Sequence, residues 1–196
     1  STYLFDAKSL QLNEVVKSGK ARYIGCSAMY AYQLLKANMI ARQNNWTEFI
    51  SIQNHYNIIY REDERELEQL IEEEGMSMTP YSPLAAGRVC RMWDDDTLRS
   101  KTDKIAPKKY DDAKEIDLPI VKRIKEVADK MGVSMAQVSL AWLLSRKCVA
   151  SPIVGCTKIT QLEDLVKAVK IKLSDDDVKY LEELYKPHNI VGALKK

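Results

Sequence analysis

The chain has 196 residues, of which 45% are hydrophobic and 30% are charged, and its formal net charge is +2. This length and composition are those of a globular protein with one sizeable core or two small ones. Basic and acidic residues are interspersed along the chain, which argues against nucleic acid or another polyanion as an obligate partner.

Cysteine usage and the terminal sequence indicate the compartment. The four cysteines (Cys26, Cys90, Cys148 and Cys156) lack CxxC or metal-ligand spacing, and only two histidines accompany them. We therefore expect reduced thiols in a cytoplasmic protein, with neither a metal site nor disulfides. No stretch approaches the roughly 18 apolar residues of a membrane span. The amino terminus lacks a signal-peptide pattern, and because it has no initiating Met we expect the chain to begin inside a longer one.

The first third of the chain alternates helix and strand patterns. Apolar residues at helical spacing predict helices that stop at glycine or asparagine, and short apolar runs closed by polar residues predict strands. The predicted elements, in order, are a helix over residues 10–17, a strand over 21–27, a helix over 31–44, a strand over 49–54 and a helix over 62–74.

Residues 77–88, SMTPYSPLAAGR, predict a third strand that opens into a loop of small side chains. Pro80 and Pro83 fix the backbone φ angle on either side of an aromatic ring and a hydroxyl. Small residues leave room for a ligand against the backbone, whose N–H groups we expect to be free, and the guanidinium of Arg88 suits phosphate. Two interpretations remain open, a nucleotide-binding floor and a buried strand end with an ordinary surface loop.

The second half begins with a segment that has no apolar period. Residues 89–117 contain an acidic run at 94–96 and a lysine-rich part at 101–109, so we expect an irregular functional or mobile loop. The elements predicted after it are helices over 118–131 and 134–146, a fourth strand over 151–157, a helix over 160–169 and a helix over 174–185. Ser174 is the expected N-cap of this last helix, which with its tail occupies residues 174–196.

The order of these elements predicts an α/β fold with four βα units, parallel strands and right-handed crossovers. Each predicted strand ends in polar or small residues, namely Ser27, Gln53 with Asn54, Tyr81 with Ser82, and Gly155 with Thr157. Because ligands of such folds bind at the carboxyl ends of the strands, we expect a binding site at this edge.

Six segments carry a resemblance to a known family: GKARYIGCSAM, SIQNHYN, YREDERELEQL, PYSPLAAGR, SPIVGCTK and LSDDDVKYLEELYKPH. Their order and spacing resemble the carboxyl-terminal half of an aldo-keto reductase of the aryl-alcohol dehydrogenase-like branch, from about residue 10 to about residue 192. The resemblance implies a (β/α)8 TIM-barrel fold, present here as a partial barrel of about the last four βα units within a single domain over residues 1–196.

The resemblance also implies NADP(H) as the cofactor and a small carbonyl or alcohol as the substrate. It implies that Ser27 and Gln53 hold the nicotinamide carboxamide and that Tyr81 stacks on the nicotinamide ring. Further implied contacts are Ser82, Leu84, Ala86, Gly87 and Arg88 along the pyrophosphate, Gly155, Thr157, Lys158 and Gln161 on the adenosine 2′-phosphate side, and Asp164 facing the adenine. For Lys158 and Gln161 the alternative is a solvated helix start.

Departures from the family pattern accompany this resemblance. Ala28 and Leu165 replace residues that bond the cofactor in the family, and each replacement removes one hydrogen bond worth about 1 kcal/mol. The family's catalytic Asp, Tyr, Lys and His lie on its first four strands, so we expect no catalytic residue here. His55 is expected to be a wall or hydrogen-bonding residue, and His188 to lie in the tail.

Two functions therefore stay open for this chain. The first is the cofactor half of an NADP(H)-dependent oxidoreductase of aldehydes, ketones or aryl alcohols. The second is a truncated, non-catalytic relative that at most binds nucleotide or a protein partner. In either case the first and fourth predicted strands are exposed edges, so we expect self-association or completion by another chain.

Overall fold

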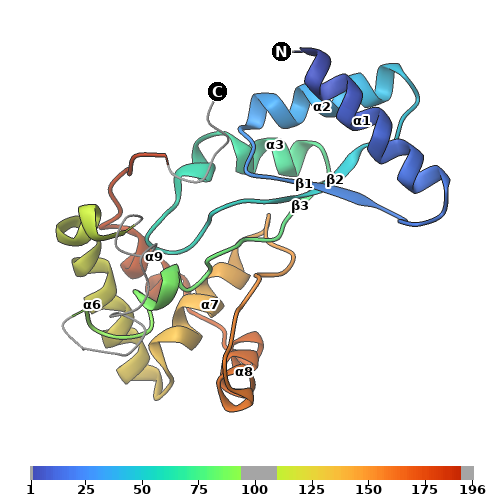
Figure 1. The fold of residues 1–196 in the computed structure, drawn as a ribbon. Helices are drawn as coiled ribbons and strands as arrows, with labels where there is room; N and C mark the ends of the chain where they lie inside the picture. Colours follow the sequence, from blue (N-terminus) through green and yellow to red (C-terminus); the bar gives the residue numbers. More distant parts are fainter. Residues whose placement is uncertain (1, 94–109, 191–196) are drawn as a thin grey trace.

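The computed structural model describes residues 2–93 and 110–190, and at its centre lies a three-stranded parallel sheet in the order β1-β2-β3 (Figure 1). The strands are β1 (Ile24–Ser27), β2 (Phe49–Gln53) and β3 (Ser77–Met78). In β1 and β2, Ser27 pairs with Gln53, and in β2 and β3, Ile52 pairs with Met78. Three predicted strands are thus confirmed, although the third is only two residues long.

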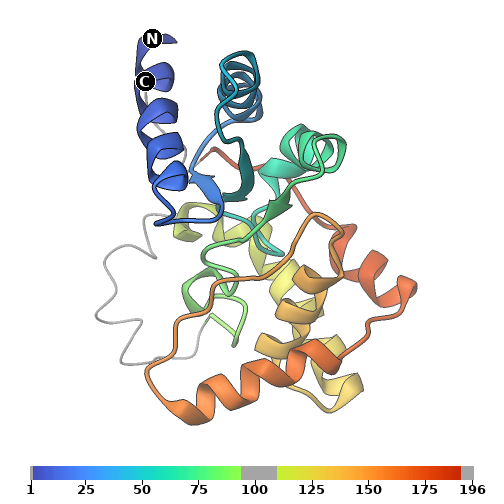
Figure 2. The ribbon, with the colours of Figure 1, turned by 90° about the vertical axis from the view of Figure 1, so that its right-hand side faces the viewer.

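Helices lie at both ends of the sheet. They are α1 (Thr2–Lys17), α2 (Ala31–Gln43), η1 (Glu62–Arg65), α3 (Leu67–Glu73), η2 (Ala85–Gly87), η3 (Asp111–Ala113), α6 (Lys114–Met131), α7 (Met135–Ser145), α8 (Ile159–Val166), η4 (Lys167–Lys170) and α9 (Asp175–Glu182). Helices α1, α2 and α3 form one group, and α6, α7, α8 and α9 form the other, with the sheet between them (Figures 1 and 2).

Helix starts agree well with the sequence pattern where a hydroxyl caps them. Ser134 accepts a hydrogen bond from the backbone N–H of Gln137, and Ser174 accepts one from the N–H of Asp177. Each bond satisfies an amide that has no partner inside the helix, which fixes the first turn. The predicted starts of α7 and α9 are confirmed for this reason.

Two predicted helix boundaries are wrong. Helix α6 begins at Lys114, one turn before the predicted residue 118, and this first turn contains Asp117, which is buried and bonded to the distant His188. The irregular segment predicted over 89–117 is therefore too long at its end, and its acidic and lysine-rich parts lie outside the described residues. The helix predicted over 62–74 is two helices, η1 and α3, because the backbone at Glu66 (φ −152°) is not helical.

The first helix is also longer than predicted. It begins at Thr2 instead of residue 10.

The fourth predicted strand, over 151–157, is wrong. A parallel bridge to β3, between Val149 and Met78, lies just before this segment, and within it the Ile153 N–H donates to the Pro80 carbonyl at 2.9 Å. A regular ladder does not continue because Pro152 has no N–H to donate and β3 is short. The fourth unit is therefore an extended segment followed by α8.

The core joins the sheet to both helix groups. Its largest fully buried side chains include Leu34 of α2, Ile52 of β2, Ile71 of α3 and Trp142 of α7. Within residues 2–93 and 110–190, no helix is both long and apolar enough to span a membrane.

Candidate functional site

The carboxyl ends of β1 and β2 bring two predicted ligand-binding residues together. Ser27 and Gln53 are register partners, and the Ser27 hydroxyl donates to the Gln53 backbone carbonyl at 2.7 Å. The Ala28 N–H donates to the same carbonyl at 3.2 Å, so the backbone is fixed where β1 ends. Because the Ser27 proton is used in this bond, its oxygen lone pairs are oriented to accept from an incoming N–H group.

Tyr81 lies at the same edge. Its N–H donates to the Asn54 carbonyl at 2.9 Å, and its backbone forms a parallel bridge with His55. Burial and the Asp63 charge raise the pKa of the Tyr81 phenol, so the ring stays neutral at physiological pH. The structure thus places Ser27, Gln53 and Tyr81 in neighbouring segments, as the pattern of strand ends predicts.

An aromatic stack beneath Tyr81 was not predicted from the sequence. The His55 ring lies parallel to the rings of Tyr60 and Tyr81, with centroid distances of 4.1 and 5.4 Å. Its Nε2 lies 2.6 Å from the Tyr110 hydroxyl. The sequence signal was the density of rings in HYNIIY, but nothing local indicates the contact with Tyr110.

The loop after Tyr81 has left-handed backbone at non-glycine residues, with φ of 52° at Ser82 and 53° at Ala86. Such conformations cost energy and are kept where the surrounding contacts impose them. The Gly87 and Arg88 N–H groups donate to carbonyls inside the loop, at 2.7 and 3.0 Å. The expectation that this backbone presents a row of free N–H groups is therefore wrong for these residues.

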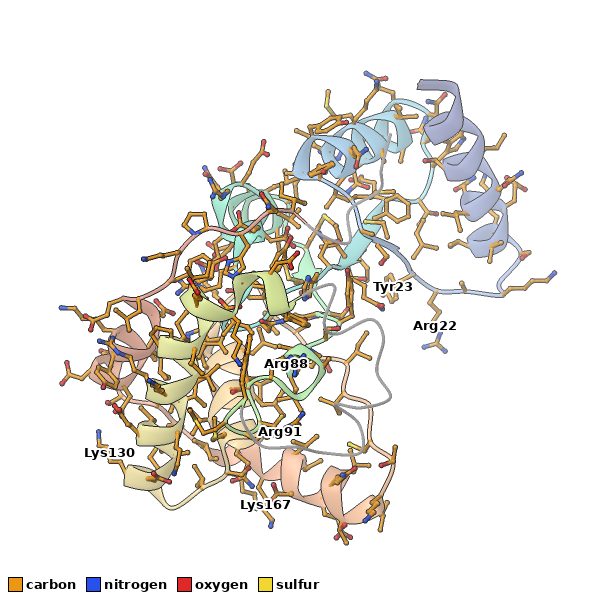
Figure 3. The ribbon with its side chains drawn as sticks, turned by 60° about the vertical axis from the view of Figure 1, so that its left-hand side comes forward. Arg22, Tyr23, Arg88, Arg91, Lys130 and Lys167 are labelled. Atoms are coloured by element: carbon orange, nitrogen blue, oxygen red, sulfur yellow. The ribbon has the colours of Figure 1, made fainter. Side chains whose placement is uncertain are left out.

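Two guanidinium groups leave this loop on the same side of the molecule (Figure 3). The Arg88 group lies over the Trp93 ring at 5.3 Å, and the Trp93 indole N–H donates to the Arg88 carbonyl at 2.7 Å. The Arg91 guanidinium donates to the Gly87 carbonyl at 3.4 Å. Stacking on the indole fixes the plane of the Arg88 guanidinium, a planar fork of donors whose geometry suits phosphate.

The predicted 2′-phosphate residues lie at the start of α8 and are exposed, with Lys158 as the N-cap. Gln161 accepts hydrogen bonds from the Thr157 N–H and hydroxyl, at 3.2 and 3.3 Å. Asp164 has contacts that were not predicted from the sequence. Its carboxylate accepts from Ser134 at 3.2 Å and from the Gln137 amide at 2.9 Å, which ties α8 to the start of α7.

A pocket of about 120 Å³ opens beside the strand ends, between residues 28–31, the 54–55 segment and η1. Asp63 lines it and accepts from the Asn54 amide at 3.0 Å. Burial raises the pKa of Asp63 to about 6. Within the described ranges 2–93 and 110–190, no group of three or more His, Cys, Asp or Glu side chains is arranged to hold a metal ion.

Comparison with known proteins gives a consistent result. The sequence pattern of the aldo/keto reductase family matches residues 6–186. A putative aryl-alcohol dehydrogenase of Schizosaccharomyces pombe is 43% identical over 188 residues, which cover 93% of this chain and 52% of that protein. The versiconal hemiacetal acetate reductase of Aspergillus parasiticus is 44% identical over 181 residues, which cover 91% of this chain and 52% of that protein. The chain thus spans about half the length of these curated relatives.

Proposed function

The chain belongs to the aldo/keto reductase family, and from this premise we propose that it is the NADP(H)-binding, carboxyl-terminal half of an oxidoreductase of aldehydes, ketones or aryl alcohols. The carboxyl-terminal assignment rests on the resemblance of the six segments. The nature of the reaction rests on the family and on relatives named as an aryl-alcohol dehydrogenase and a hemiacetal acetate reductase.

The observation that carries the proposal is the meeting of Ser27, Gln53 and Tyr81 at one sheet edge. A carboxamide needs both a hydrogen-bond acceptor and a donor, and the Ser27 oxygen and the Gln53 amide supply these chemistries. A neutral phenol ring supplies a flat face on which a planar heterocycle can stack. Bound nicotinamide would supply hydride transfer at this edge. A proton donor is not among the residues we assign.

The charges of Arg88 and Lys158 support the placement of the phosphate groups of the cofactor. Ser82, Leu84, Ala86, Gly87 and Arg88 would follow the pyrophosphate, and Gly155, Thr157, Lys158 and Gln161 would take the 2′-phosphate side. A guanidinium at one end and an ammonium at a helix start at the other both favour anions. Asp164 would face the adenine, with its carboxylate also held by Ser134 and Gln137 at the start of α7.

We expect the purified chain to bind NADPH with a micromolar or weaker dissociation constant and to prefer it to NADH. Arg88→Ala should weaken binding of both nucleotides about tenfold, because a charge-assisted hydrogen bond is lost. Lys158→Ala should weaken NADPH binding to a similar degree and leave NADH binding unchanged. Fluorescence titration of the bound nucleotide measures these effects.

Lys147→Ala is the matched control, because this lysine is exposed and pairs with Glu72 of α3, away from the strand ends. It should bind like the wild type. Absence of NADPH binding by a folded wild-type chain would contradict the proposal and favour a non-catalytic relative.

Open flanks support a further part of the proposal, that additional βα units cover this half of a barrel. Helix α8 buries none of its residues, and the apolar stripe of Ile159, Leu162 and Val166 in α8 with Val169 in η4 is 39–72% exposed. On the opposite flank, before β1, Tyr23 is 70% exposed. Apolar faces of this kind, together with strand edges, recruit partners. In the isolated chain, a second copy would supply the missing contacts.

Sedimentation velocity tests this association. The wild-type chain should sediment as a species larger than the 22.4 kDa monomer. Ile159→Lys with Val166→Lys should shift it towards monomer without lowering its helix content, because neither side chain is buried. Met39→Lys, on the exposed face of α2, should leave the association unchanged. A wild-type chain that sediments as a monodisperse monomer would refute this part of the proposal.

A further inference from the structure

We propose that His55 is a positioning residue, which holds the Tyr81 ring at the angle on which the nicotinamide ring stacks. This inference rests on the proposed function, because it presupposes that Tyr81 contacts the cofactor. The contacts of His55 themselves come from the structure alone.

The two faces of the Tyr81 ring have different surroundings. His55 and Tyr81 are bridged through their backbones, and their rings are parallel to within 13° at a centroid distance of 5.4 Å. His55 therefore lies against one face of Tyr81, and a ligand ring that stacks on Tyr81 must use the opposite face. The tilt of the phenol, and with it the plane offered to the ligand, follows the plane of the imidazole.

The His55 imidazole is itself fixed on its other sides. The Tyr60 ring lies parallel to it, with an interplanar angle of 17° and a centroid distance of 4.1 Å. Tyr110 meets it edge-on at 71° and bonds Nε2 at 2.6 Å. His55 and Tyr110 are only 3% and 2% exposed. A ring held between two others and bonded at its edge has little freedom to rotate.

Asn57 joins the His55–Tyr110 hydrogen bond to the backbone that follows Tyr81. The Asn57 amide nitrogen lies 3.4 Å from both His55 Nε2 and the Tyr110 hydroxyl, and it donates to the Ser82 carbonyl at 2.9 Å. An amide N–H group cannot accept, so Asn57 donates its second proton to Nε2 or to the Tyr110 hydroxyl, and either choice ties Asn57 to this pair. The same cluster therefore fixes the Tyr81 ring from beneath and the backbone that follows it.

The His55 cluster contacts the candidate site at the end where the nicotinamide would bind. Tyr110 precedes α6 and is 55 residues from His55 in sequence. The cluster reaches the candidate site through Tyr81 and the adjoining Ser82 carbonyl, whereas Lys158 lies at the start of α8 on another segment. Disturbing His55 should thus weaken contacts with the nicotinamide end of the cofactor and spare those with the adenosine 2′-phosphate end.

The test compares two ligands on the same variants, NADPH and 2′,5′-ADP, which lacks the nicotinamide. Tyr110→Phe removes only the hydroxyl, and His55→Phe keeps a flat ring but loses its bond. Each should weaken NADPH binding roughly threefold to tenfold, the effect of one hydrogen bond, and leave 2′,5′-ADP binding unchanged. His55→Ala, which removes the stack as well, should weaken NADPH binding at least tenfold. Tyr180→Phe, the same change at an exposed tyrosine of α9, is the control and should change neither ligand.

Several results would overturn the inference. Equal losses for both ligands would indicate a general structural role of His55, and unchanged NADPH binding in all three variants would show that the stack does not orient Tyr81. If His55→Ala fails to fold, Tyr110→Phe alone still decides, because it deletes a single oxygen atom. A folded wild-type chain that does not bind NADPH, whether or not it binds 2′,5′-ADP, would instead refute the proposed function and the inference with it.

Discussion

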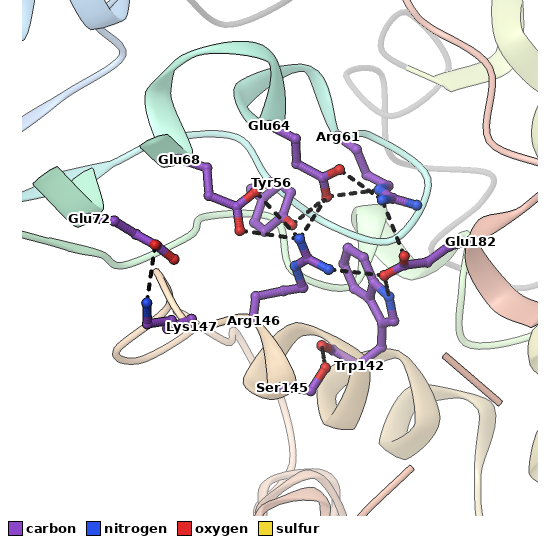
Figure 4. Close-up of polar contacts among 10 residues, drawn as sticks. All are labelled: Tyr56, Arg61, Glu64, Glu68, Glu72, Trp142, Ser145, Arg146, Lys147 and Glu182. Atoms are coloured by element: carbon purple, nitrogen blue, oxygen red, sulfur yellow. Dashed lines mark hydrogen bonds and ion pairs between the residues drawn. The ribbon is translucent and has the colours of Figure 1, made fainter. Parts of the chain in front are cut away.

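Replacing Arg146 by Ala should lower the free energy of unfolding by about 2–4 kcal/mol. The Arg146 guanidinium lies 3.1 Å from carboxylate oxygens of Glu68 and Glu182 and 3.9 Å from one of Glu64 (Figure 4). It thereby joins η1 and α3 to α7 and α9. Loss of Arg146 would leave Glu68 without this partner, whereas Arg61 would still pair with Glu64 and Glu182.

The environment of these charges makes the expected effect large. The side chains of Arg146 and its three partners are each only about one fifth exposed, from 19% to 23%. The Arg146 guanidinium also lies 5.7 Å from the centre of the Trp142 ring, whose indole N–H donates to Glu182 at 2.8 Å. Because these side chains are partly exposed, the expected loss in the free energy of unfolding is smaller than for a fully buried ion pair but much larger than for a surface pair.

Lys147 provides a matched control for this prediction. It is the next residue, it pairs with Glu72 at 3.1 Å, and its side chain is 82% exposed. Lys147→Ala should change the free energy of unfolding by less than about 0.5 kcal/mol. Urea unfolding of both variants measures the difference, and equal losses would show that burial does not govern the contribution of these ion pairs.

The parts of the fold that were predicted are those with local causes. Ser134 and Ser174 each cap a helix through a residue three positions later, so a short sequence window contains the whole interaction. The strands that contain Ser27 and Gln53 are apolar runs that end in polar residues, and the pairing of parallel strands then brings these ends together.

The parts that were missed depend on contacts between distant residues. The additional first turn of α6 contains Asp117, which binds His188, 71 residues away. The hydrogen bonds of Asp164 with Ser134 and Gln137, across 30 and 27 residues, were not predicted either. No periodicity or motif in one segment encodes such a partner, so the sequence predicted which edge holds the candidate site but not what supports it.

The last prediction concerns the segment after α9, which two buried groups fasten to the rest of the molecule. His188 Nε2 lies 2.8 Å from an Asp117 carboxylate oxygen, and the side chains are 8% and 0% exposed. The backbone N–H of His188 donates to the Glu62 carboxylate at 2.7 Å. The His188 ring packs against Tyr60, the outer member of the His55 stack. Burial lowers the pKa of His188, but the Asp117 hydrogen bond and charge outweigh it, so the pKa is raised above 6.5.

Asp117→Asn should therefore destabilise the chain in a pH-dependent way. A raised pKa in the folded state means that protonated His188 contributes its full stability below pH 6.5 and loses it as the pH rises through the folded value. The variant keeps an oxygen that accepts from His188 but loses the charge. We expect it to be less stable than the wild type by about 2 kcal/mol at roughly pH 6, and by much less at roughly pH 9.

Denaturant unfolding of the wild type and the variant across this pH range gives the free energy of unfolding of each against pH. The difference between these two curves tests the prediction. Asp112→Asn, at an exposed aspartate just before α6, is the matched control and should give the same small difference at every pH. A constant difference for Asp117→Asn would mean that His188 stays neutral in the folded chain. A difference that grows as the pH rises would reverse the expected sign, because the Asp117 charge would then stabilise the chain most when His188 has lost its proton.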